Sequence, residues 1–182
     1  MALTELLSLN GLILIKPQIF TDSRGYFFES YNQKKMMGDS FHEIFVQDNE
    51  SLSHKGVLRG LHYQLPPYAQ GKLVRVVSGS VLDVVVDLRK SSSTYLQHYT
   101  VELNSENKWM LYIPPGFAHG FATLADNTCF QYKCTQYWIK EAEAGILWND
   151  SRFNIDWKIS NPLLSEKDLK LPLYNADENP FD

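Results

Sequence analysis

Residues Lys72 to Leu88 read KLVRVVSGSVLDVVVDL and carry the clearest structural pattern in the chain. Two valine-rich runs flank Ser78-Gly79-Ser80, which predicts two β-strands joined by a hairpin turn. Because side chains alternate along a strand, the even-numbered residues from Leu82 to Leu88 share one face and the odd-numbered residues from Val81 to Asp87 share the other. We therefore expect Asp83, which alternates with valines, to point into an interior.

Other short apolar segments repeat this pattern, with turn residues between them at roughly ten-residue intervals. Eight further strands are expected, at Leu12 to Phe20, Tyr26 to Tyr31, Ile44 to Asn49, Val57 to Gln64, Leu96 to Leu103, Trp109 to Ile113, Phe117 to Leu124 and Thr128 to Trp138. Strands of this length and spacing predict a mainly β protein, a double-layered antiparallel barrel of the jelly-roll type.

Helix is expected only in short pieces. Gln33 to Phe41 is expected to form one helix, and Ser165-Glu166-Lys167-Asp168 is typical of a capping box that opens another. The tail from Pro172 is polar and interrupted by proline, so we expect it not to pack tightly. Because no repeat, low-complexity tract or linker divides the chain, residues 1–182 are expected to form a single domain.

Composition and charge exclude several classes of protein. The chain has 182 residues, of which 44% are hydrophobic, enough for a core without disulfides or a structural metal. Its 17 Lys and Arg against 21 Asp and Glu give a net charge of −4. Such a field repels polyanions, so a nucleic-acid partner is not expected. Any anionic ligand requires a local cluster of Arg and Lys.

The cysteines and the first residues predict the compartment. Cys129 and Cys134 do not form a C-x-x-C pair, and we expect both to be reduced thiols. The first fifteen residues contain Glu5, lack a basic region and are interrupted by polar residues, unlike a signal peptide. A cytoplasmic protein with no membrane partner is expected.

The densest group of reactive side chains is Arg59 to Gln64, RGLHYQ, followed closely by Lys72. Arg59 and His62 lie on opposite faces of a strand unless a bulge intervenes at Gly60. A single histidine most often has a structural role. The nearby Arg59 and Lys72 favour a functional role for His62.

A second group is Pro114 to Gly120, PPGFAHG, in which a Pro-Gly turn delivers His119 onto a strand. This spacing is typical of the second half of a cupin metal site, whose first half reads H-x-H followed by a Glu. Here Gln64 and Lys72 stand in place of the second His and the acid. An amide and an ammonium leave too few ligands for a divalent ion, so no metal is expected.

Short motifs along nearly the whole chain together point to one family. They are Asp22 to Glu29, Val46 to Ser51, Gly56 to Gln64, Gln70 to Arg75, Pro114 to Gly120, Gly145 to Asp150 and Ser165 to Asp168. In this order they resemble the dTDP-4-dehydrorhamnose 3,5-epimerases, metal-free enzymes of rhamnose synthesis. The resemblance implies a cupin-like double-stranded β-helix, a nucleotide-sugar substrate, no cofactor and a homodimer.

The resemblance also implies a reaction and its catalytic residues. The family inverts carbons 3 and 5 of dTDP-4-dehydro-6-deoxy-D-glucose, which flank a ketone, by removing and returning protons. His62 matches the base, Asp168 its carboxylate partner, Lys72 the cation that meets the enolate and Tyr132 the proton donor on the opposite face. From the residues alone, Asp83 is a second candidate for a buried acid near the histidines.

Each of these residues has a structural alternative. Asp168 alone completes a capping box with Ser165, Asp83 faces water at a hairpin edge, Tyr132 is a core residue, and Lys72 is a solvated strand lysine.

Further positions match substrate contacts of the family. Arg24, Arg59 and Lys167 are expected to bind the diphosphate, since guanidinium groups donate in parallel pairs. Tyr137-Trp138 is expected to stack on the base, although relatives carry a tyrosine at position 138. The other matching contacts are Glu29, Gln47, Asn49, His119 and Glu143.

In the family, an N-terminal strand crosses into the partner of a dimer, so Arg24 and Glu29 are expected to serve the neighbouring site. Three other functions remain open at this point: a relative that epimerises only carbon 3 or carbon 5, a metal cupin enzyme built on His62 and His119, and a non-catalytic binding module.

Overall fold

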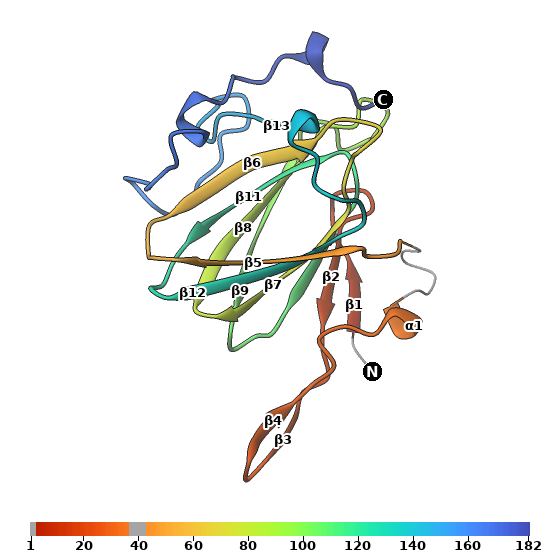
Figure 1. Ribbon diagram of the computed structural model, residues 1–182, viewed down its shortest axis with the longest axis vertical. Helices are drawn as coiled ribbons and strands as arrows, with labels where there is room; N and C mark the ends of the chain where they lie inside the picture. The colour runs from red at the N-terminus through yellow and green to blue at the C-terminus, as the bar shows by residue number, and fades with distance from the viewer. Residues whose placement is uncertain (1–2, 37–42) are drawn as a thin grey trace.

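The computed structural model describes residues 3–36 and 43–182, and these form two facing β-sheets (Figure 1). One sheet has the strand order β1 (Leu3–Leu6), β2 (Ile13–Lys16), β10 (Met110–Ile113), β7 (Lys72–Ser78), β12 (Thr128–Cys134) and β5 (Gln47–Ser53). The other has the order β13 (Glu143–Gly145), β6 (Leu58–Gln64), β11 (Phe117–Thr123), β8 (Ser80–Asp87) and β9 (His98–Asn104). This arrangement confirms the mainly β, jelly-roll fold class.

The remaining elements are short. A two-stranded ribbon of β3 (Phe20–Asp22) and β4 (Gly25–Phe27) projects from the sandwich (Figure 1). The helices are α1 (Gln33–Met36) and the 3-10 turns η1 (Lys140–Ala142), η2 (Asp168–Lys170) and η3 (Ala176–Glu178). No helix in the described ranges has the length and apolar character needed to cross a membrane.

The expected hairpin at Ser78-Gly79-Ser80 is wrong. β7 belongs to the six-stranded sheet and β8 to the five-stranded sheet, so this turn carries the chain from one layer to the other. β8 is buried along almost its entire length, between β11 and β9. Its partner on one side is β9, the next strand in the chain, and its partner on the other side is β11, which lies further along the sequence.

The expected alternation along β8 is confirmed, and both of its faces pack. Val81 and Val85 lie in the core between the sheets, whereas Leu82, Val84 and Val86 pack in a second cluster on the outside of the five-stranded sheet.

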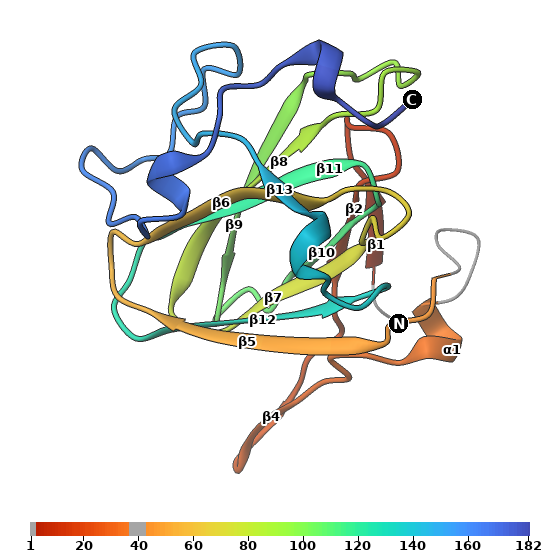
Figure 2. The ribbon, with the colours of Figure 1, turned by 45° about the horizontal axis from the view of Figure 1, so that its top comes forward.

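The expectation of a loose tail is also wrong, because the C-terminal segment covers this outer cluster (Figure 2). Tyr174 and Phe181 are buried there, and Asn179 Nδ2 donates to Leu88 O at 2.6 Å. An uncovered apolar sheet face costs free energy in water, and the tail removes that cost.

Several expected boundaries shift. The strand expected at Thr128 to Trp138 ends at Cys134, and the one expected at Tyr26 to Tyr31 is shorter, Gly25–Phe27. Strands β1 and β13 were not expected. The helix expected at Gln33 to Phe41 begins as α1. Its last five residues, 37–41, lie outside the described residues.

One irregularity in β6 positions the side chains discussed below. His119 of β11 lies opposite His62, and Phe121 lies opposite Arg59, so β6 carries one extra residue between these pairs. A bulge at Gly60, the exception that the sequence left open, is therefore present. Gly60 has φ of +124°, and a Cβ there would lie 2.5 Å from Gly120 Cα, so only glycine fits. The bulge turns Arg59 and His62 toward the same cavity.

We predict that Gly60→Ala destabilises the protein by about 2 kcal/mol or more beyond Gly25→Ala, because of overpacking. Gly25 is a matched control: its φ is +127°, but a Cβ there meets nothing within 4 Å. Gly25→Ala should therefore cost only the backbone strain, about 1–2 kcal/mol. Free energies of unfolding in urea measure both changes. Equal losses for the two variants would contradict a steric requirement at Gly60.

Candidate active site

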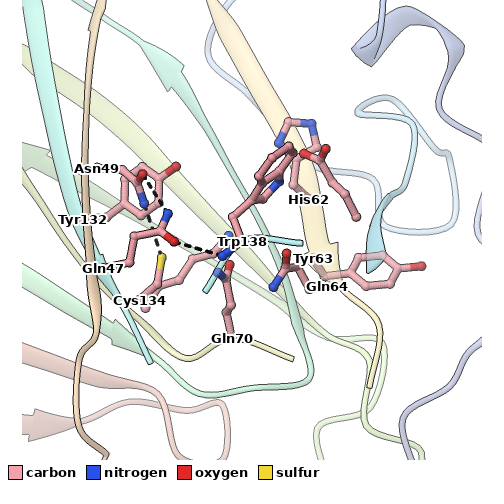
Figure 3. A pocket seen from close by; sticks show the side chains of 11 residues that line it. Gln47, Asn49, His62, Tyr63, Gln64, Gln70, Tyr132, Cys134 and Trp138 are labelled. Carbon is pink, nitrogen blue, oxygen red and sulfur yellow. Dashed lines mark hydrogen bonds between the residues drawn. The ribbon is translucent and has the colours of Figure 1, made fainter. Parts of the chain in front are cut away.

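Two adjoining cavities, of about 320 and 290 Å³, open between the sheets and share His62, Lys72 and Tyr132. The first is also lined by the predicted binding residues Gln47, Asn49, Trp138 and Glu143 (Figure 3). The second is also lined by Arg59, His119, Lys167 and Asp168. The structure therefore brings together eleven of the predicted site residues, from both sheets and from the C-terminal segment.

His62 is paired with a buried carboxylate. Its Nε2 lies 2.5 Å from Oδ1 of Asp168, which is 3% exposed. The Ser165 hydroxyl accepts a hydrogen bond from the Asp168 backbone N–H at 3.1 Å, so Ser165 caps this turn while the Asp168 side chain turns to His62. Asp168 therefore joins the turn through its backbone N–H and pairs with His62 through its carboxylate.

The charge on Asp168 is held in place by its neighbours. Burial alone raises the pKa of this carboxyl, but the hydrogen bond and charge of His62, aided by Ser165 and Lys167, lower it on balance. Asp168 is therefore ionised at neutral pH, which fixes the imidazole and stabilises its protonated form.

A second histidine and carboxylate pair lies beside the first. His119 Nε2 is 2.9 Å from Oδ2 of Asp83, whose side chain is fully buried. The interior orientation expected for Asp83 is confirmed, and the water-facing alternative is wrong. Asp83 Oδ1 has no hydrogen-bond partner within residues 3–36 and 43–182. Asp83 lies behind His119, which lines the second cavity.

Lys72 and Tyr132 complete the centre of the site. Burial lowers the pKa of Lys72, and the negative charges of Asp83 and Glu143 partly oppose that shift. Burial raises the pKa of Tyr132, so its phenol keeps its proton at neutral pH. Tyr132 comes from β12 and His62 from β6, so an acid and a base face the cavity from opposite sheets (Figure 3).

Cations and polar groups surround this centre. Arg59 donates to Ser53 Oγ through Nε and a terminal nitrogen, at 3.3 and 3.2 Å. Lys167 forms an ion pair with Glu143 at 2.5 Å. The cavities therefore gather Arg59, Lys72 and Lys167 although the whole chain is acidic.

Two predicted residues lie away from the cavities of this chain. Arg24 sits at the turn of the β3–β4 ribbon, with its side chain 88% exposed and paired with Asp22. Glu29 binds Lys35 and Asn32.

Sequence reasoning missed some lining residues, including Cys134, whose Sγ lies 3.6 Å from Asn49 Nδ2. Its spacing of two from Tyr132 on one strand was an available signal, because such residues share a face. Within the described parts of the chain, no group of three or more His, Cys, Asp or Glu side chains is placed to hold a metal ion.

Comparisons with known proteins agree with this arrangement. The family model described as dTDP-4-dehydrorhamnose 3,5-epimerase matches residues 6–176. An enzyme of that name from Shigella flexneri is 54% identical over 159 residues, which cover 87% of this chain and 88% of the relative. The one from Pseudomonas aeruginosa is 51% identical over 164 residues, covering 89% and 90%.

Solved structures are also similar to this chain. The dTDP-4-dehydrorhamnose 3,5-epimerase of Elizabethkingia anophelis has a TM-score of 0.92 at 45% identity and covers 98% of both chains. The dTDP-6-deoxy-D-glucose-3,5-epimerase of Legionella pneumophila, in complex with dTDP-4-keto-L-rhamnose, has a TM-score of 0.94 at 42% identity and covers 100% of this chain and 99% of its own. Sequence and structure together place the chain in the dTDP-4-dehydrorhamnose 3,5-epimerase family.

Proposed function

We propose that this protein inverts carbons 3 and 5 of dTDP-4-dehydro-6-deoxy-D-glucose and so forms dTDP-4-dehydro-L-rhamnose. The observation that carries the proposal is the placement of His62 and Tyr132 on opposite walls of one cavity. Inversion at carbon needs a base on one face and a proton donor on the other. A Streptomyces bikiniensis 3'-monoepimerase is 31% identical, whereas the Shigella flexneri 3,5-epimerase is 54% identical.

In the first step, His62 removes the proton from a carbon beside the ketone. The C–H bond breaks, its electron pair moves into the enolate, and the proton forms an N–H bond on the imidazole. Asp168, at 2.5 Å, stabilises the imidazolium. A positioned base of this kind accelerates proton transfer by about 10²–10⁴-fold.

The enolate places its charge on the carbon 4 oxygen, where Lys72 provides the opposing charge. Charges attract more strongly where water is excluded, so a protonated Lys72 stabilises this oxyanion more than it would in water. Losing an oxyanion contact of this type costs about 3–4 kcal/mol in the barrier.

In the second step, Tyr132 gives its proton to the opposite face of the same carbon. A new C–H bond forms with inverted configuration, and the enolate returns to the ketone. The tyrosinate takes a proton from water and the imidazolium releases one to water, so the reaction balances without a redox cofactor or a metal.

The remaining cavity residues bind the nucleotide. Arg59 and Lys167 meet the diphosphate, and the indole of Trp138 stacks on the thymine. Polar contacts to the sugar and the nucleoside come from Gln47, Asn49, His119 and Glu143.

We further propose that residues 1–182 act as one domain in a homodimer, in which the N-terminal segment reaches the partner. Support comes from the β3–β4 ribbon, which projects from the sandwich and exposes Phe20, Tyr26 and Phe27 (Figure 1). Arg24 and Glu29 then complete the neighbouring site. Cys129 and Cys134 are free thiols, which suits the reducing cytoplasm.

We predict that His62→Ala lowers turnover by about 10²–10⁴-fold and also abolishes exchange of substrate protons with D₂O, because the base is lost. Tyr132→Phe should lose turnover to a similar extent and yet retain exchange, since His62 still removes and returns protons on one face. NMR of the sugar measures both.

Tyr99→Phe is the matched control for Tyr132→Phe, since Tyr99 lies in β9 and outside both cavities. It should leave turnover and exchange unchanged. Full activity of His62→Ala would refute the assignment of the base.

A mixed dimer tests the exchange of the N-terminal segment. We predict that a purified heterodimer of one Arg24→Ala and one His62→Ala subunit has about half the activity of the wild type, because one of its two sites is intact. A heterodimer of His62→Ala and Tyr132→Phe should stay inactive, since both residues belong to the same site. If the first heterodimer is no more active than its better parent, Arg24 does not serve the partner.

A further inference from the structure

We propose that Gln64 is a positioning residue that holds Trp138 in place for the base of the nucleotide. The inference deepens the proposed function and rests on it. It also gives a role to the residue that stands where a metal cupin carries its second histidine.

Gln64 uses its whole side-chain amide to bind the backbone of two loops. It lies in β6, two residues after His62, and is 4% exposed. Its Nε2 donates to Tyr68 O at 2.8 Å and to Tyr137 O at 3.1 Å, and its Oε1 accepts from the Ile139 backbone N–H at 2.7 Å. Only one orientation of the amide satisfies two carbonyls and one N–H, so the amide is fixed.

These contacts lie on both sides of Trp138. Gln64 binds the residues before and after it, and the backbone N–H of Trp138 itself donates to Oε1 of Gln47 at 2.9 Å. Gln47 belongs to β5 and Gln64 to β6, so the loop is fixed to both sheets at the edge of the cavity (Figure 3).

The indole is half exposed. Trp138 is 51% exposed, yet it lines the first cavity. An exposed aromatic face suits a flat ligand group, and stacking is strongest when the ring is held before the ligand arrives. Arg59 and Lys167, the residues proposed to bind the diphosphate, line the second cavity. The loop that Gln64 holds should therefore affect binding of the base and not binding of the diphosphate.

The test compares two ligands, thymidine diphosphate and inorganic pyrophosphate, by calorimetry. Gln64→Met keeps an unbranched side chain but loses all three hydrogen bonds. We expect Gln64→Met to weaken the binding of thymidine diphosphate about tenfold and to change the binding of pyrophosphate by less than about twofold. The reason is that only the stacking platform is loosened. KM should rise in parallel while kcat at saturating substrate stays within about threefold.

Gln131→Met is the matched control. Gln131 lies outside both cavities, and its Oε1 accepts from the Arg75 guanidinium at 3.0 and 2.9 Å, so the variant loses side-chain hydrogen bonds without touching the loop. It should change thymidine diphosphate binding by less than about threefold. If Gln64→Met does not fold, Gln64→Leu replaces it, since this uncharged side chain also loses all three hydrogen bonds. The same result is expected.

A double-mutant cycle with Trp138→Ala gives the decisive comparison. In that background Gln64→Met should cause no further loss of thymidine diphosphate binding. The proposal is overturned if Gln64→Met binds thymidine diphosphate like the wild type, if it weakens both ligands equally, or if its effect persists without Trp138. A wild-type protein that binds neither ligand would instead refute the proposed function.

Discussion

The close contact between Gly60 of β6 and Gly120 of β11 determines the shape of the site. A Cβ on Gly60 would lie 2.5 Å from Gly120 Cα, and one on Gly120 would lie 2.7 Å from Arg59 O. Because the two backbones approach so closely, β6 can carry one extra residue while it stays paired with β11. In a regular strand without this bulge, Arg59 and His62 are three residues apart and would face opposite sides of the sheet. Anion binding and proton removal in one cavity therefore depend on two positions that lack side chains.

Burial also determines how the charged side chains of the site are paired and protonated. Asp168 and Asp83 are both buried, and each is paired with a histidine, because an unpaired buried carboxylate is costly. Negative groups near Lys72 raise the pKa of its ammonium group, but burial lowers that pKa by more. Arg59, Lys72 and Lys167 thus share the cavities with Glu50, Glu143 and Asp168, and these three basic residues suit an anionic substrate that becomes an enolate during the reaction.

The sequence predicted local features well and long-range ones poorly. Alternation along β8 correctly predicted which residues share a face and that Asp83 is buried. Ser78-Gly79-Ser80 predicted a change of direction but not that the next strand joins the other sheet, because turn residues do not specify strand partners. Burial of the tail was missed because it depends on an uncovered outer face of a distant sheet. The bonds of Gln64 were missed for a similar reason, since Tyr137 and Ile139 are far away in sequence.

The central claim is that one cavity removes and returns protons at both carbons beside the ketone. It is tested most directly by incubating the wild-type protein with dTDP-4-dehydro-6-deoxy-D-glucose in D₂O and following each sugar carbon by NMR. The account predicts deuterium at carbons 3 and 5, with both configurations inverted. Deuterium at a single carbon, or none with the substrate bound, would contradict it.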